Sequence, residues 1–192
     1  MLLNIELLIV EELLKSFNTK LTGSYISKKN NLNQKTVSNH LTELENMHIL
    51  KSETQGRNKL YGLNLDNEHL VKEFVLAIEH LKSLNFYKKN LLVKEVLGKI
   101  FHYVKGIVII FGSYAKGIQK KSSDLDIMII GKCDEDKVEL VAETYNLEIS
   151  LKIYPKFEKD LLMKEVVKNH IIIKNGELFV GEIIKWIKLN GV

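Results

Sequence analysis

Two largely apolar runs, residues 106–111 and 124–130, flank a loop that begins with Gly-Ser and leads into Asp-Leu-Asp. Short runs rich in Ile and Val predict buried strands. An acid-started segment at residues 134–145 predicts a helix after the second run, and the alternating segment 147–154 predicts one more strand. This order is typical of a small mixed α/β domain, which we predict for the C-terminal part of the chain.

The polar residues of the loop suit phosphate and metal chemistry. Asp124 and Asp126 lie two apart on a predicted strand, so both carboxylates leave the same face with about 6.6 Å of rise between them. Such carboxylates can bind Mg²⁺, as one ion or as a bridged pair. Gly112 lets the backbone approach a phosphate, the Ser113 hydroxyl can donate to it, and Lys116 adds a mobile positive charge. Phosphoryl and nucleotidyl transfer need mainly positioning and charge neutralisation, which these residue types supply.

The motif is Gly112-Ser113, ten residues, then Asp124-x-Asp126, with a predicted strand on each side. Over about residues 88–180 the chain therefore resembles the nucleotidyltransferases related to DNA polymerase β, and among them the minimal nucleotidyltransferases. The resemblance implies that the two aspartates are catalytic metal ligands and that Mg²⁺-NTP is the substrate or ligand. The nucleotide-binding residues that it implies are Gly112, Ser113, Lys116 and Ser123.

A third metal-binding carboxylate is usual in this superfamily, on a neighbouring strand. Along residues 147–154 the apolar side chains take one face and leave Glu148, Ser150 and Lys152 on the other. Glu148 is therefore the predicted third catalytic and metal-binding residue. It departs from the aspartate that is common there.

The same residues have a simpler interpretation. An isolated Asp-x-Asp pair is commonly a solvated strand end, and Ser-Asp is frequent in turns. The combination with Gly112-Ser113 favours a nucleotide site, and leaves open whether that site still catalyses or is vestigial. A P-loop is excluded because Ile118-Gln119 stands where Lys-Ser/Thr is required.

The histidines and the cysteine predict no zinc site. The six histidines show no paired ligand spacing, and Cys133 is the single cysteine, so His40 and His48 are interpreted as packing or surface residues. One cysteine gives no disulfide framework, and no apolar run approaches the roughly 18 residues of a membrane span. We therefore expect a cytoplasmic protein without a membrane partner.

The N-terminal third predicts three helices. Apolar residues recur at helical spacing over residues 4–17, and a short second helix follows Thr22-Gly23-Ser24. Asn33 is placed to cap a third helix that begins at Gln34. The inward-facing residues predicted are Leu7, Leu8, Val10, Leu14 and Phe17 in the first helix, and Val37, Leu41 and Leu44 in the third.

Two strand-like runs, residues 49–53 and 59–65, enclose a glycine turn and predict a hairpin. Three helices followed by a hairpin resemble a winged helix-turn-helix, which implies docking on double-stranded DNA. Five lysines and no acidic residue occur over residues 15–42, although the net charge is only +4. The predicted DNA-contacting residues are Gln34, Lys35, Ser38, Asn39, Arg57 and Lys59. The alternative left open is a winged helix that makes protein contacts only.

Residues 67–82 carry apolar positions at helical spacing and predict a connecting helix, with a joint at residues 85–90. Its apolar face is the basis for a predicted homodimer, because a regulator gains affinity from two half-sites. We predict three parts: a winged helix-turn-helix at 1–66, a connecting helix at 67–87 and a nucleotidyltransferase domain at 88–192.

The sequence supports two functions. The first is a DNA-binding transcriptional regulator that carries a Mg²⁺-NTP-binding domain. The second is an active nucleotidyltransferase that moves a nucleoside monophosphate onto a protein or small-molecule hydroxyl. A protein acceptor is implied by the resemblance to minimal nucleotidyltransferases that act as antitoxins.

Overall fold

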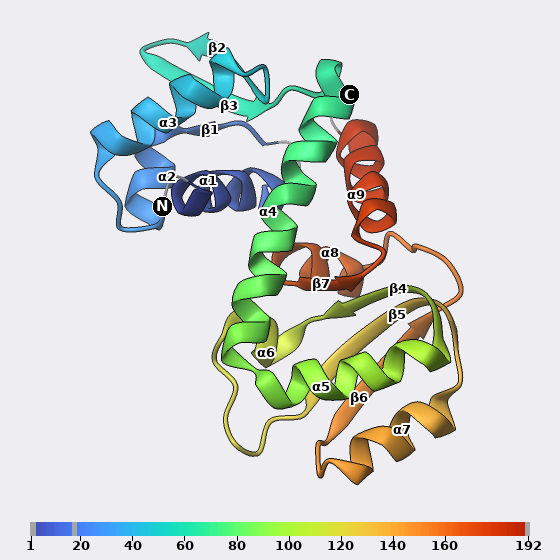
Figure 1. The fold of residues 1–192 in the computed structure, drawn as a ribbon. Helices are drawn as coiled ribbons and strands as arrows, with labels where there is room; N and C mark the ends of the chain where they lie inside the picture. The colour runs from blue at the N-terminus through green and yellow to red at the C-terminus, as the bar shows by residue number, and fades with distance from the viewer. Residues whose placement is uncertain (1–2, 17–18, 191–192) are drawn as a thin grey trace. The chain divides into compact units, whose positions relative to one another are not determined.

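The computed structural model describes residues 3–16 and 19–190 (Figure 1). The chain divides into two compact units. The first joins the described residues up to Ile78 with those from Val180 onward, and the second is Glu79–Phe179. No helix in the described part of the chain is long and apolar enough to cross a membrane.

The described part of the first unit that precedes residue 64 contains three helices and a small antiparallel sheet with the strand order β1-β3-β2. The order along the chain matches the predicted helices and hairpin, with one addition. Strand β1 pairs with β3 through Leu21 opposite Tyr61 and Thr22 opposite Leu60. The elements are α1 (Leu3–Lys15), β1 (Leu21–Thr22), α2 (Gly23–Lys29), α3 (Gln34–Asn46), β2 (Leu50–Gln55) and β3 (Asn58–Leu63).

Helix α3 begins as its sequence predicts. The Asn33 side chain accepts hydrogen bonds from the backbone N–H groups of Lys35 and Thr36, at 2.9 and 3.2 Å, and so satisfies donors that a helix leaves unpaired at its start. The three predicted inward residues are buried. They are Val37, Leu41 and Leu44.

Helix α1 buries a stripe that is rotated from the predicted one. Ile9 and Leu13 are buried with Val10 and Leu14, whereas Leu7 and Leu8 are only half-buried. The remaining predicted position, Phe17, lies outside the described residues.

The predicted joint at residues 85–90 is wrong for most of its length. After a short 3₁₀ turn, η1 (Leu65–Asn67), a single helix, α4 (Glu68–Lys89), runs through residues 85–89, and the helical run is interrupted only at Asn90. The boundary between the compact units falls inside α4, and the residues from Val180 group with the N-terminal unit. The ranges 1–66, 67–87 and 88–192 stay a prediction about domains, and the compact units divide the chain at other places.

The apolar face proposed for dimerisation, which consists of Leu70, Phe74, Ile78 and Leu81, is only partly exposed. Ile78 is buried, Phe74 and Leu81 are half-buried, and Leu70 is exposed, at 39%. The homodimer stays a prediction.

The second unit has a mixed four-stranded sheet with the order β6-β5-β4-β7. β4 pairs with β5 and β7 antiparallel, and β5 pairs with β6 in parallel. Its remaining elements, with α9 continuing into the first unit, are α5 (Leu91–Ile100), η2 (Phe101–Tyr103), β4 (Val104–Ile110), α6 (Gly112–Lys116), β5 (Leu125–Cys133), α7 (Glu135–Thr144), β6 (Ile149–Tyr154), α8 (Leu161–Lys168), β7 (Ile171–Lys174) and α9 (Gly176–Asn190).

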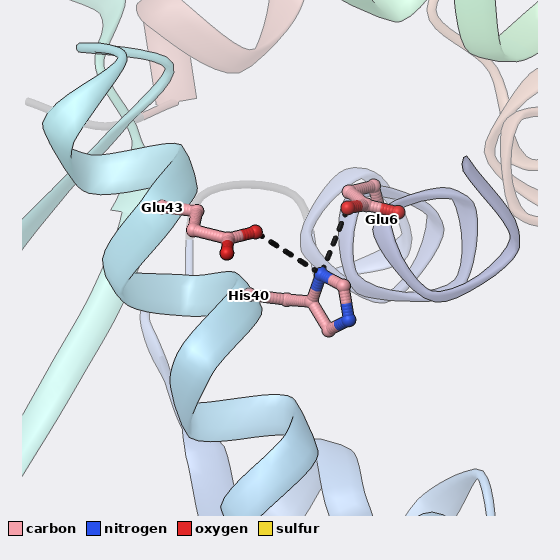
Figure 2. A group of neighbouring side chains, drawn as sticks. All are labelled: Glu6, His40 and Glu43. Carbon is pink, nitrogen blue, oxygen red and sulfur yellow. Dashed lines mark hydrogen bonds and ion pairs between the residues drawn. The ribbon is translucent and has the colours of Figure 1, made fainter. Parts of the chain in front are cut away.

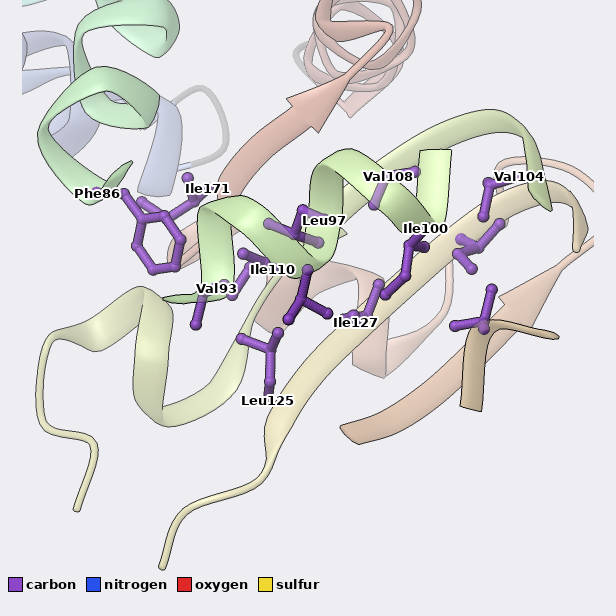
Figure 3. Close-up of a cluster of buried hydrophobic side chains, with 13 residues drawn as sticks. Phe86, Val93, Leu97, Ile100, Val104, Val108, Ile110, Leu125, Ile127 and Ile171 are labelled. Carbon is purple, nitrogen blue, oxygen red and sulfur yellow. The ribbon is translucent and has the colours of Figure 1, made fainter. Parts of the chain in front are cut away.

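One face of this sheet is covered by α5 and α7 (Figure 1). Leu125 and Ile127 of β5 join Leu97 and Ile100 of α5 in a buried apolar cluster (Figure 3). Side chains alternate along a strand, so the residues between them, including Asp126, face the other side of the sheet. The core thereby fixes the direction in which the polar residues point.

Candidate active site

The site begins where the chain leaves β4. Phe111 is extended, and its N–H donates to the backbone oxygen of Asp126 at 3.1 Å. Gly112 then starts α6 with a φ of +65°. The two halves of the predicted motif, Gly112-Ser113 and Asp126, are therefore neighbours across the junction of β4 and β5.

Gly112 is required by the carboxylate beside it. A Cβ atom added there would lie 1.9 Å from Asp126 Oδ2, and the positive φ is itself unfavourable for any residue with a Cβ. The sequence suggested that Gly112 makes room for a phosphate. In the structure it makes room for the carboxylate of Asp126.

The two aspartates form an electrostatically strained pair. Asp126 is half-buried and Asp124 is exposed. Burial and the negative charge of Asp124 raise the pKa of Asp126, and the positive charge of Lys152 opposes that rise. The alternating pattern of residues 147–154 predicted that Lys152, on β6, lies on the polar face of its strand. The sequence analysis did not predict that the charge of Lys152 acts on Asp126.

Glu148 lies next to the pair along the sheet. β5 and β6 are parallel with Leu125 opposite Ile149 and Asp126 opposite Ser150, and the N–H of Leu125 donates to the oxygen of Glu148 at 2.8 Å. Glu148 thus comes directly before β6, rather than inside the strand as the alternating pattern predicts.

Glu148 and Asp124 both line a cavity of about 640 Å³. Two further acids of α7, Glu139 and Glu143, and Asn146 after it also line this cavity. The sequence analysis assigned these three residues no role, although Glu139 and Glu143 stand four apart, which places them on one side of a helix. The remaining lining residues are Ala142, Leu147 and Ile149.

The three predicted metal ligands lie farther apart than another group of ligand-type side chains in the structure. Among the described residues, the group of three carboxylate or imidazole ligands with all ligand atoms within 4.8 Å of one another is Glu6, His40 and Glu43 (Figure 2). Asp124, Asp126 and Glu148 do not form such a group. A shared role for these three carboxylates therefore stays a prediction.

The aspartate pair nevertheless fits a divalent cation. Its donor atoms are all carboxylate oxygens, which Mg²⁺ prefers. Burial, and after it the negative charge of Asp124, disfavours the charged form of Asp126 and raises its pKa. A cation held there would offset both effects.

The remaining predicted nucleotide-binding residues have separate surroundings. Ser113 lies in α6 and is half-buried, and Lys116 is exposed at the end of that helix. The charge of Lys116 contributes to lowering the pKa of Glu165 on α8, after the larger effects of Lys168. The Ser123 hydroxyl accepts from the N–H of Lys120 at 2.9 Å and so closes a turn of the loop.

Comparison with known proteins identifies the region that contains this site. Residues 94–178 match the family model described as "Polymerase beta, Nucleotidyltransferase". This region is a polymerase β-like nucleotidyltransferase domain. Asp124, Asp126 and Glu148 all lie inside the matched residues of the nucleotidyltransferase domain.

Two individual proteins are similar to parts of the chain. One is "Putative protein adenylyltransferase MJ1547" of Methanocaldococcus jannaschii, which is 32% identical over 75 residues, or 39% of this chain. The chain spans 60% of the length of that relative. The other is a solved chain described as "Crystal structure of the toxin-antitoxin with AMP-PNP", with 16% identity, a TM-score of 0.39, and coverage of 50% of this chain and 85% of that one.

The predicted DNA-contacting residues lie in the first unit, which consists of helices and a small antiparallel sheet. The four on α3 are exposed: Gln34, Lys35, Ser38 and Asn39. Arg57 is exposed at the turn of the β2–β3 hairpin. A cavity of about 300 Å³ is lined jointly by Gln34 and Ser38 of α3 and by Arg57 and Lys59 of the hairpin. The fold therefore brings the helix face and the hairpin turn together.

Lys59, unlike Arg57, has side-chain partners among the residues that the structure describes. Its Nζ donates to Glu45 Oε2 at 2.7 Å and lies 5.1 Å from the centre of the Tyr61 ring. The hydrogen bond that Lys59 donates to Glu45 raises the pKa of Lys59, and interactions with the charges of Tyr61 and Glu45 add to the rise. Its charge is already engaged within the protein.

Proposed function

We propose that the chain is a nucleotidyltransferase that moves a nucleoside monophosphate from a Mg²⁺-bound NTP to an acceptor hydroxyl. The acceptor oxygen forms a bond to the α-phosphorus, the bond between the α- and β-phosphates breaks, and pyrophosphate leaves. The observation that carries this proposal is the Asp124–Asp126 pair, with Asp126 packed against Gly112, inside a polymerase β-like nucleotidyltransferase domain. Phosphoryl transfer demands mostly charge neutralisation and alignment, and an unbalanced pair of carboxylates is suited to hold the cation.

The proposed roles follow from position. Asp124 and Asp126 hold the Mg²⁺, which when bound neutralises triphosphate charge. The Ser113 hydroxyl donates to a phosphate oxygen, and Lys116 adds a positive charge near the same loop. Glu148, which shares the cavity with Asp124, accepts the proton of the attacking hydroxyl.

ATP is the proposed donor and a protein hydroxyl the proposed acceptor. The support is the 32% identity to a protein whose name describes an adenylyltransferase acting on proteins. A small-molecule hydroxyl is the other acceptor that the same chemistry admits.

The test is incubation of the full chain with Mg²⁺, a cell lysate and ATP labelled at the α-phosphate or, separately, at the γ-phosphate. We expect label from the α-phosphate, and none from the γ-phosphate, on a protein acceptor. Asp124→Asn and Asp126→Asn should remove this transfer, whereas Asp136→Asn, an exposed aspartate on α7, should not. Equal labelling by wild type and both active-site variants would refute the proposal.

A second proposed function is binding of double-stranded DNA by the first unit, as in a transcriptional regulator. The cavity shared by α3 and the hairpin turn supports it, because a helix face and an adjoining arginine can contact base edges and backbone together. Retardation of genomic fragments by the full chain, lost when Lys35 and Arg57 are both replaced by Ala, is the expected result. Equal retardation by wild type and the double variant would contradict it.

A further inference from the structure

A second cluster of ligand-type side chains lies in the first unit, outside the nucleotidyltransferase domain. Glu6 comes from α1, and His40 and Glu43 come from α3 (Figure 2). Nδ1 of His40 is 2.8 Å from Glu6 Oε1 and 3.5 Å from Glu43 Oε2. The three ligand atoms all lie within 4.8 Å of one another.

This cluster has more acceptors than protons. A ring nitrogen carries at most one hydrogen, so Nδ1 can donate well to only one of the two carboxylates that face it. Glu6 is only 8% exposed, and its second oxygen, Oε2, is buried without a hydrogen-bond partner among the described residues. A buried carboxylate oxygen without a partner is costly unless a hydrogen-bond donor, a water molecule or a cation compensates it.

We propose that Glu6, His40 and Glu43 bind a divalent transition-metal ion of the Zn²⁺ class. One imidazole nitrogen and carboxylate oxygens are ligands that Zn²⁺ accepts, and three protein ligands leave a coordination position for water. The ion takes the place of the Nδ1 proton. A single hydrogen can bond well to only one of the two carboxylates, whereas the ion can be coordinated by both. It links α1 to α3, the helix that carries the proposed DNA-contacting face.

The site differs from the aspartate pair in its chemistry. An imidazole ligand favours Zn²⁺ and its neighbours over Mg²⁺, whereas the oxygen-only pair favours Mg²⁺. Removing the aspartates therefore isolates the new site without touching it. Asp124→Asn/Asp126→Asn is used as the parent protein for every measurement.

The experiment is calorimetric titration of Zn²⁺ into the tag-free full chain after treatment with a chelator. We expect one Zn²⁺ per chain in the parent, at least tenfold weaker binding after His40→Gln or Glu43→Gln, and unchanged binding after His69→Gln. His69 is an exposed histidine on α4 and serves as the matched control. Co²⁺ provides a second readout, because its visible absorption should develop on binding to the parent and fail to develop with His40→Gln.

Glu43→Gln keeps the test decisive if His40→Gln unfolds the first unit. The Glu43 side chain is 60% exposed, so its replacement removes a ligand without opening the core. Zn²⁺ should raise the melting temperature of the parent and not that of Glu43→Gln, a difference that a purely structural hydrogen bond does not produce. Absence of Zn²⁺ binding in the parent, or parental affinity in Glu43→Gln, would overturn the proposal.

Discussion

Two clusters of charged side chains in the second unit differ in how the charge of their carboxylates is compensated. Glu79 on α4 is 2% exposed and lies 3.0 Å from Lys82 Nζ and 3.4 Å from His170 Nε2. Burial alone would raise the pKa of Glu79, but the charges of His170 and Lys82 outweigh it and lower this pKa to about 2. Nδ1 of His170 also lies 3.0 Å from the carbonyl oxygens of Val166 and Val167.

The Asp124–Asp126 pair has the reverse arrangement. It is more exposed, and the pKa of Asp126 is raised by burial and by its like-charged neighbour, with Lys152 opposing. This difference in burial and charge indicates a different role for each cluster. We expect the Glu79 cluster to contribute to the stability of the fold and the aspartate pair to contribute to ligand binding. Substitutions should therefore separate stability from binding.

The largest expected effect is on binding. Asp124→Asn and Asp126→Asn should each weaken Mg²⁺-dependent ATP binding by about a thousandfold, or about 4 kcal/mol, because each removes an anionic ligand. Neither should lower the melting temperature, since repulsion within the pair is relieved. Calorimetry of ATP binding with and without Mg²⁺ checks the first point, and thermal unfolding checks the second. Wild-type ATP affinity in either variant would show that the aspartate pair does not bind the Mg²⁺-ATP complex.

The next effect is on stability. Glu79→Gln should lower the free energy of unfolding by about 3 kcal/mol, because removal of the carboxylate leaves the largely buried Lys82 ammonium without the anionic charge of Glu79. Glu73→Gln, an exposed position on the same helix, should change it by less than about 0.5 kcal/mol. Urea unfolding monitored by circular dichroism gives both values. Equal stabilities for the two variants would show that the Glu79 cluster contributes nothing.

Acid should reproduce part of that loss in the wild type. The pKa of Glu79 is about 2 in the folded protein and its ordinary value is 4.5, so the unfolded chain binds the proton more readily between these values. The stabilisation from Glu79 is therefore complete above pH 4.5 and is lost as the pH falls towards 2, by about 2 kcal/mol at pH 3. Unfolding curves at pH 6 and pH 3 should show a smaller difference for Glu79→Gln than for wild type. Identical pH dependence in both proteins would exclude this assignment.

Part of the motif of the nucleotidyltransferase domain was visible in the sequence because it is local. Asp124 and Asp126 are two residues apart at the start of β5, so strand periodicity predicts that both carboxylates leave on one side, although Asp124 itself lies just before the strand. The position of Gly112 against Asp126 depends on the pairing of β4 with β5, which periodicity does not give. The cap at Asn33 and the buried face of α3 were equally accessible, because both depend on residues within one helix.

Clusters that join distant segments were not predictable from periodicity. Glu6 and His40 are 34 positions apart, and nothing in either helix specifies that they meet. His40 was accordingly interpreted as a packing or surface residue, although Glu43 three positions later was a local signal. Strand β1 was missed for a related reason, since its two residues are defined by pairing with β3 rather than by any pattern of their own.

Gly112 tests whether the carboxylate needs the space that the structure gives it. Gly112→Ala should cost about 1.5 kcal/mol of stability, because a Cβ meets Asp126 and the φ is +65°. It should also weaken Mg²⁺-ATP binding by displacing that carboxylate. Gly98→Ala on α5, where a Cβ meets nothing within 4 Å, should instead stabilise the protein slightly. Unchanged stability and ATP affinity in Gly112→Ala would show that Asp126 does not depend on this glycine.

The smallest expected effect is on DNA binding by the first unit, where Lys59 is paired with Glu45 and Arg57 is exposed at the hairpin turn. Arg57→Ala should weaken DNA binding about three- to tenfold and reduce its salt dependence, because an exposed cation at the hairpin turn displaces counterions from the phosphates. Lys59→Ala should have a smaller effect, since Lys59 already pairs with Glu45 at 2.7 Å and would have to give up that partner to contact DNA. Asn39→Ala, which removes an amide able to bond base edges, should reduce sequence preference while leaving non-specific binding intact. Gel retardation across a salt series, on a preferred and a random duplex, measures all three variants. A larger loss from Lys59→Ala than from Arg57→Ala would mean that its ion pair with Glu45 opens on DNA, and that pairing within the protein does not withdraw a cation from binding.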